Sequence, residues 1–130
     1  MIVRDATPDD IPALVGMHNA LGSEYPWPDL YDGTFMAVQV VESDGTPVMA
    51  AMARRTAEAF LLLDPSWATP GFRFEAMRSL EAAAMRRLAE LHVNDCHALI
   101  PPMVERRFGR RLEKMGWWHP TWPLYARKVG

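Results

Sequence analysis

The sequence predicts a single mixed α/β domain, in which helices flank one sheet of six or seven strands. Three observations lead to this prediction. Apolar segments of strand length alternate with segments whose apolar residues recur at helical spacing. Two strand-like segments flank an Asp-Gly turn, as in an antiparallel hairpin. The chain of 130 residues is long enough to bury a core without disulfides, and its single cysteine, Cys96, excludes a bridge within the chain.

The N-terminal part is predicted to begin with a strand over residues 2–5 and to continue into a helix. Thr7 is placed to cap that helix, Pro8 suits its first turn, and two acidic residues follow where the helix dipole favours them. Apolar residues recur at helical spacing up to Gly22, which suits a helix end. Residues 24–32, rich in aromatic residues and proline, are expected to form a loop.

The central part is predicted to hold three strands and the longest helix. Residues 35–41 and 48–54 form the hairpin, and residues 58–64 form the next strand. A Pro/Gly turn then leads into a helix over residues 71–92, whose apolar positions are spaced at 3, 4, 4 and 3 residues: Met77, Leu80, Ala84, Leu88 and Leu91.

The C-terminal part is predicted to contain a strand, a helix and one or two final strands. The strand covers residues 95–101, and the helix ends at Gly116. Its apolar stripe consists of Val104, Phe108, Leu112 and Met115. Residues 117–129 are expected to complete the sheet, although two prolines interrupt them.

Charge is distributed unevenly along the chain. The net charge is −2, but residues 1–65 carry −7 and residues 66–130 carry +5. No stretch approaches the length of a membrane span, and a lone thiol suits a reducing compartment. We therefore expect a soluble, cytoplasmic protein.

Four local phrases, in this order of elements, resemble the GNAT superfamily of acyl-CoA-dependent N-acetyltransferases. They lie at residues 2–14, 42–48, 63–67 and 112–117, so the resemblance covers nearly the whole chain. It implies a GNAT-like sheet, with a loop after the fourth strand whose N–H groups hold the pyrophosphate of acetyl-CoA at the start of a helix.

The chain departs from that family where the chemistry would take place. The family's loop reads Arg or Gln, two variable residues, Gly, one variable residue, then Gly or Ala. Gly71 matches, whereas Ala68 and Arg73 replace the other two residues. Arg73 could obstruct the approach of the backbone to a phosphate, or its guanidinium could bind the phosphate directly. The family's frequent catalytic Tyr falls on Leu112, which cannot transfer a proton.

The resemblance also implies candidate site residues. If acetyl-CoA binds, it would contact the end of the fourth strand and the start of the long helix, at Leu62, Leu63, Gly71, Phe72 and Arg73. Glu58 would be the general base, although a strand-end Glu is more commonly only solvated. Glu24 and Tyr25 could contact a substrate amine. No metal is expected, because neighbouring side chains in the cluster of His92, Asp95, Cys96 and His97 point apart; Cys96 is interpreted as a half-buried core thiol.

The C-terminal part is the predicted interaction surface. Basic residues lie along one side of the last helix and tryptophans follow it, the two residue types most enriched in interface hot spots. The candidates are Arg106, Arg110, Trp117, Trp118 and Trp122, within a set that also contains Arg107, Arg111 and Lys114. A solvated helix face is the simpler interpretation of the basic residues. We expect a protein partner or self-association, and neither nucleic acid nor membrane.

Together these features predict a GNAT-fold protein that is catalytically degenerate and serves as an interaction or structural component of a larger assembly. The chain also resembles GNAT-like proteins encoded among bacteriophage structural genes, which would make that assembly a virion. No cofactor is expected in this case. The alternative is an acetyl-CoA-dependent N-acetyltransferase that acts on a primary amine with an atypical cofactor loop.

Overall fold

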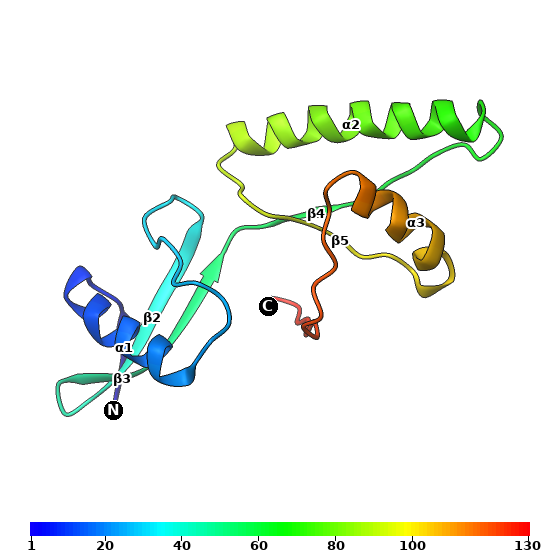
Figure 1. The fold of residues 1–130 in the computed structure, drawn as a ribbon. Helices are drawn as coiled ribbons and strands as arrows, with labels where there is room; N and C mark the ends of the chain where they lie inside the picture. The colour runs from blue at the N-terminus through cyan, green and yellow to red at the C-terminus, as the bar shows by residue number, and fades with distance from the viewer. The chain divides into compact units, whose positions relative to one another are not determined.

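The computed structural model describes residues 1–130 and shows a mixed α/β chain with three α-helices and five strands (Figure 1). The order of elements agrees with the predicted order as far as the last helix. It is β1 (Ile2–Asp5), the 3-10 helix η1 (Pro8–Asp10), α1 (Ile11–Leu21), β2 (Phe35–Ser43), β3 (Thr46–Arg54), β4 (Ala57–Ala59), α2 (Pro70–Glu90), β5 (Cys96–Ala98) and α3 (Pro102–Lys114).

The chain divides into two compact units. One comprises residues 1–58 and 82–97, with 11 acidic and 5 basic residues, and we call it the acidic unit. The other comprises residues 59–81 and 98–130, with 5 acidic and 9 basic residues, and we call it the basic unit. Their net charges are −6 and +4. A division into two units does not decide whether the chain folds as one domain or two, so the single domain stays a prediction.

An antiparallel sheet of three strands, in the order β1-β2-β3, forms the framework of the acidic unit. The predicted hairpin is confirmed: β2 pairs with β3, and Ser43 lies opposite Thr46. The two turn residues between them, Asp44 and Gly45, both have positive φ, 52° and 77°. A two-residue hairpin turn whose twist matches that of the two strands requires positive φ at both turn residues, and an Asp-Gly pair adopts such values readily.

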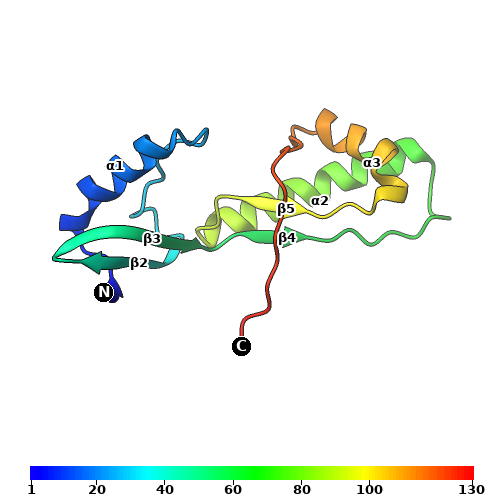
Figure 2. The same cartoon turned by 90° about the horizontal axis from the view of Figure 1, so that it is seen from below.

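Helix α1 lies along one face of this sheet (Figure 2). Leu14 of α1 and Val40 of β2 are the fully buried apolar side chains, with exposed fractions of 3% and 1%. Gly22 ends α1 in the left-handed conformation, and its N–H donates to the carbonyl of Asn19 (3.2 Å). The predicted helix end is confirmed. The contact between α1 and the sheet is thus the core of the acidic unit.

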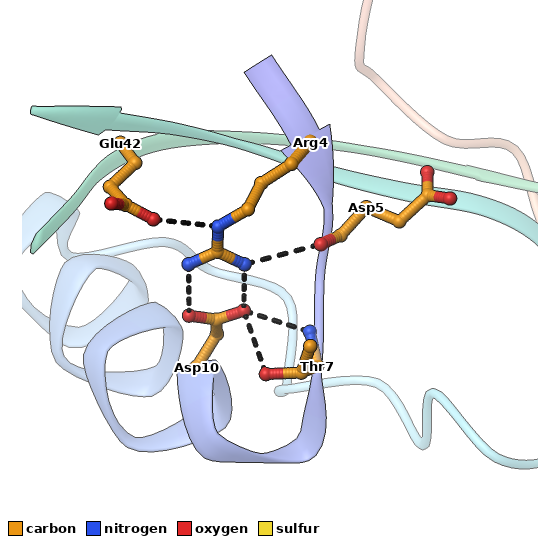
Figure 3. A network of polar contacts seen from close by, with 5 residues as sticks. All are labelled: Arg4, Asp5, Thr7, Asp10 and Glu42. Atoms are coloured by element: carbon orange, nitrogen blue, oxygen red, sulfur yellow. Dashed lines mark hydrogen bonds and ion pairs between the residues drawn. The ribbon is translucent and has the colours of Figure 1, made fainter. Parts of the chain in front are cut away.

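A polar network joins β1, η1 and β2 (Figure 3). Arg4 binds both carboxylate oxygens of Asp10 (Nη1 to Oδ2, 2.8 Å; Nη2 to Oδ1, 3.0 Å), and its Nε donates to Glu42 Oε2 (2.7 Å). The backbone N–H of Thr7 also donates to Asp10 Oδ2 (2.8 Å). These bonds, chiefly those from Arg4, hold the pKa of the buried Asp10 far below its usual range. The network therefore fixes the first turn of the N-terminal helix against the sheet.

The prediction of one sheet with six or seven strands is wrong. The structure has five strands in two sheets, the second being the short pair β4-β5. The predicted strand over residues 58–64 is only β4, and that over residues 95–101 is only β5. Beyond Ala98 the chain passes through Leu99 and Ile100 into α3, which begins at Pro102, so residues beyond Ala59 gain no partner strand.

The expected final strand is also absent, because residues 117–129 form neither helix nor strand. Pro120 and Pro123 lack the N–H groups that a continuous ladder would use. The last helix does end where the sequence predicts. Gly116 has a φ of 95°, and the N–H of Trp117 donates to the carbonyl of Leu112 (3.0 Å).

Helix α2 begins and ends close to its predicted limits of 71 and 92. Its C-terminal end is formed by His92, which has a φ of 57°, and by a bond from Val93 N–H to the carbonyl of Leu88 (3.0 Å). The apolar stripe is only partly covered, since Leu80 and Leu91 are exposed. Neither this longest helix nor the others have an apolar stretch of the length needed to cross a membrane.

Candidate functional site

The loop that joins β4 to α2 begins with a turn around Asp64. Its Oδ1 accepts hydrogen bonds from the hydroxyl (2.6 Å) and the backbone N–H (2.9 Å) of Ser66. The N–H of Trp67 donates to the carbonyl of Asp64 (3.1 Å). The bonds from Ser66 lower the pKa of the Asp64 carboxyl. The turn is held by its own residues.

Thr69 forms the start of α2. Its hydroxyl oxygen accepts a bond from the N–H of Phe72 (3.3 Å), and its carbonyl accepts the N–H of Arg73 (3.0 Å). Pro70, at the first helical position, has no N–H to offer. The bond to Arg73 is the first regular bond of the helix. Of the N–H groups that a bound phosphate could use at this helix start, that of Phe72 is engaged with Thr69, and position 70 has none.

Arg73 closes the loop from the first turn of α2. Its Nη1 donates to three backbone carbonyls, those of Ala68 (2.8 Å), Trp67 (3.0 Å) and Pro65 (3.3 Å). Ala68 reaches this position with a φ of 54°, in the left-handed region that non-glycine residues rarely adopt. The loop thus directs carbonyl oxygens toward the guanidinium of Arg73, whereas an anion-binding loop directs N–H groups toward its ligand.

Gly71 does not serve the purpose that glycine has in a pyrophosphate loop. A side-chain carbon at this position would meet only the hydroxyl of Thr69, at 4.0 Å, which is ordinary contact. The backbone conformation of Gly71 is also open to other residues. The single feature of the family's loop that the sequence retains is therefore not required by the geometry around it.

The other candidate cofactor residues are turned to solvent. The exposed fractions are 94% for Leu62 and 65% for Phe72, and Leu63 is also exposed. None of them lines either of the two surface grooves described below. The structure does not gather these side chains into a binding pocket.

The candidate groups for proton transfer lie on different elements. Glu58 is on β4, exposed, between two half-buried alanines, and takes part in no ion pair. Leu112, at the position of the family's Tyr, is half-buried on α3 and can supply no proton. Glu24 and Tyr25 are exposed in the loop after α1.

A groove of ≈370 Å³ at the end of α2 and the start of β5 is lined by three of the four cluster residues, whereas His97 is exposed and is not among its lining residues. Its lining residues are Met85, Leu88, Ala89, His92, Val93, Asn94, Asp95 and Cys96. Asp95 is occupied by an ion pair with Arg54, and no three His, Cys, Asp or Glu side chains are arranged to hold a metal ion. Cys96 is half-buried, as predicted, and desolvation raises the pKa of its thiol.

A second groove, of ≈280 Å³, lies beside the aromatic loop after α1. It is lined by Ile11, Trp27, Pro28, Asp29, Leu30 and Tyr31. His18 of α1 orders this loop: its Nε2 bonds to the carbonyl of Tyr25 (2.9 Å), and its ring meets those of Tyr25 and Trp27 edge-on. The sequence alone gives no sign of this role, which depends on a loop seven residues further along the chain.

The predicted interaction residues lie on α3 and the segment after it. Arg106 and Arg110 are exposed, as are Trp118 and Trp122, at 79% and 58%. Trp117 differs, because it is half-buried and its Nε1 donates to Glu81 Oε1 of α2. Trp117 therefore anchors the C-terminal segment and leaves the neighbouring tryptophans at the surface.

Comparisons with protein-family models, with curated proteins and with solved structures found no match to this chain.

Proposed function

We propose that this chain is a catalytically degenerate GNAT-like protein that serves as an interaction component of a larger assembly. The order of its elements, in which a strand and helix precede a hairpin and two strand-to-helix units, supports the GNAT-like assignment. Its loop chemistry supports the degeneracy, and its exposed basic and aromatic surface supports the role in assembly.

The observation that carries the proposal is the position of Arg73. The pyrophosphate of acetyl-CoA would have to lie at the start of α2, where Arg73 instead binds the carbonyls of residues 65, 67 and 68. A phosphate that displaced the guanidinium would leave three carbonyl oxygens facing its own negative charge. A phosphate that kept Arg73 would find few free N–H groups beside it, because Thr69 engages that of Phe72 and Pro70 has none.

The proton-transfer chemistry also lacks one of its usual groups. Departure of a CoA thiolate is assisted by a general acid, and Leu112 occupies the matching position. Even if the cofactor bound, the thiolate would take its proton from water, so acetyl transfer would be slow. The proposed role in an assembly depends neither on a bound cofactor nor on a general acid. A virion is the setting that the resemblance to phage-encoded proteins suggests.

Calorimetric titration with acetyl-CoA tests the proposal. We expect no binding stronger than a Kd of about 1 mM, which corresponds to about −4 kcal/mol. A Kd in the low micromolar range, together with acetyl transfer to a primary amine that Glu58→Gln abolishes, would establish the acetyltransferase instead.

Two arginine variants test the role of Arg73 in the proposed failure of the cofactor to bind. Arg73→Ala removes the side chain that binds the loop carbonyls, and Arg78→Ala removes an exposed arginine one turn and a half further along α2. If Arg73 obstructs the site, only Arg73→Ala strengthens the weak binding. If wild-type binding is tight and Arg73→Ala alone abolishes it, Arg73 is a phosphate ligand and the degeneracy is wrong.

A further inference from the structure

We infer that the basic unit of this chain docks onto the acidic unit of a second copy, through the basic side of α3 and the tryptophans that follow it. This inference rests on the proposed function as an interaction component and names its partner. The contact joins two different surfaces, so each copy can engage one neighbour through its acidic unit and another through its basic unit.

Helix α3 presents a continuous row of cations without acidic partners. At 100° per residue, its basic positions cover one side of the helix, from the edge of the stripe of Val104, Phe108, Leu112 and Met115 round to the position of Glu113. All are exposed and none takes part in an ion pair: Arg106, Arg107, Arg110, Arg111 and Lys114. Five like charges on less than four turns repel one another, so an acidic surface placed against them relieves that repulsion.

Exposed aromatic residues follow this row of cations in the sequence. Trp118 and Trp122 follow α3 in a segment that Trp117 fixes through its bond to Glu81. Trp and Arg are the side chains that most often dominate the free energy of protein association. The surface therefore combines charge that selects a partner with rings that can hold it.

The basic unit exposes apolar surface that a partner would cover. All four fully buried residues of the chain, Asp10, Leu14, Thr34 and Val40, belong to the acidic unit. In the basic unit every residue keeps a part of its surface in solvent, and large side chains such as Tyr125 and Leu124 are mostly exposed. Apolar surface of this extent is typical of a protein interaction site.

The acidic unit offers the complementary charge. Six of its carboxylates are exposed and take part in no ion pair: Asp5, Asp9, Glu24, Asp29, Asp44 and Glu58. In Figure 3 the carboxylate of Asp5 points away from the network that engages Asp10 and Glu42. A net charge of −6 on this unit and +4 on the basic unit favour contact between opposite units of two copies.

The same charges favour a protein partner over nucleic acid. Arginine and aromatic residues also suit a single strand. However, the whole chain has a net charge of −2 and a pI of ≈6.1, and the acidic unit would repel phosphates brought close to it. In a second copy of the chain, the basic unit attracts the acidic unit of the first copy, and the acidic unit attracts the basic unit.

Sedimentation velocity on the full chain, from ~1 μM to ~1 mM, tests the inference. At low salt we expect concentration-dependent association beyond the dimer, which ~0.5 M NaCl weakens. Arg106→Gln with Arg110→Gln should raise the dissociation constant by about tenfold, and Trp118→Ala by about 30-fold. Arg86→Gln is the matched control, because it removes an exposed arginine from the acidic unit; association should remain or tighten.

A mixing experiment identifies the two surfaces. The variant that combines Asp5→Asn, Asp9→Asn and Glu24→Gln keeps its basic unit, and the Arg106→Gln, Arg110→Gln variant keeps its acidic unit. Each should associate weakly alone, whereas the mixture should recover a 1:1 dimer with nearly wild-type affinity. Circular dichroism confirms that each variant is folded.

Three results would overturn the inference. They are a wild type that stays monomeric at low salt, a mixture that fails to recover association, and a monomer that binds a labelled single-stranded oligonucleotide through Arg106 and Arg110. None of them restores acetyl-CoA binding, so the proposed degeneracy would stand with a different partner. Conversely, micromolar acetyl-CoA binding would contradict the degeneracy and leave the self-association to its own test.

Discussion

Leu14 provides the sharpest test of where this chain keeps its core. Its side chain is 3% exposed, between α1 and the sheet, and Leu14→Ala removes three carbon atoms from it. At about 0.8 kcal/mol for each buried CH₂ group, the transfer term is about 2.4 kcal/mol, and the cavity left behind raises the loss to about 3 kcal/mol. Such a loss is a large part of the usual free energy of unfolding of a small domain.

Urea denaturation followed by circular dichroism measures this loss, at a salt concentration that keeps the chain monomeric. The matched control is Leu62→Ala, the same substitution at a side chain that is 94% exposed, and it should change the free energy of unfolding by less than about 0.5 kcal/mol. If both variants lost about 3 kcal/mol, Leu62 would be buried in the monomer. The assignment of Leu14 to the core and of Leu62 to the surface would then be refuted.

Three further changes test individual contacts. Because the folded-state pKa of Asp10 is depressed, its contribution to stability is complete above the unfolded pKa of about 3.9 and is lost as the pH falls below it. In Asp10→Asn, urea midpoints should therefore decline less steeply between pH 6 and pH 3 than in the wild type; an unchanged profile would contradict the network. Gly45→Ala should lower the free energy of unfolding by about 1 kcal/mol, since φ at this position is 77°, and a thermal midpoint equal to the wild type's would argue against the hairpin turn. Arg73→Ala should speed amide hydrogen exchange in residues 66–69, whereas Arg78→Ala should not; equal exchange in both variants would exclude the Arg73 bonds.

Local features of the fold could be predicted because a few adjacent residues determine them. Asp44 and Gly45 adopt the positive φ values of a tight hairpin, and few other pairs would do so readily. Gly22 and Gly116 end their helices for the same reason. In each case the residue type favours the backbone conformation at its own position, whatever the rest of the chain does.

Features that depend on distant partners could not be predicted. Arg4 reaches Glu42 only because β1 and β2 pair in a register that places Ile2 opposite Glu42, 40 positions further along. The length of β4 depends on its partner strand β5. Pro101 and Pro102, which follow β5 in the sequence, limit how far β5 can extend, and they come after α2, far from β4 in the sequence. The sequence indicates a propensity for strand structure in residues 58–64, but it does not indicate whether a neighbouring strand is long enough to pair with all of them.

The sequence singled out the loop between β4 and α2 but left its chemistry open. Arg73 stood out because it replaces a small residue, and the sequence left open whether it obstructs a phosphate or binds one. In the structure its Nη1 binds loop carbonyls. Those carbonyls come from the five residues between Pro65 and Thr69, and no pattern in their side chains indicates which way the backbone turns. Ala68, with its positive φ, determines that direction.

The exposed apolar surface of the basic unit also bears on the lifetime of the protein in a cell. Quality-control proteases and chaperones bind apolar segments that are left in solvent, and Phe60, Leu62 and Met103 offer such segments in a chain without a partner. If copies associate as we propose, those that find a neighbour would hide this surface, whereas surplus copies would keep it accessible to degradation. The steady-state amount of the protein would then follow the number of assembly positions available, so that stoichiometry is regulated by turnover and not by synthesis alone.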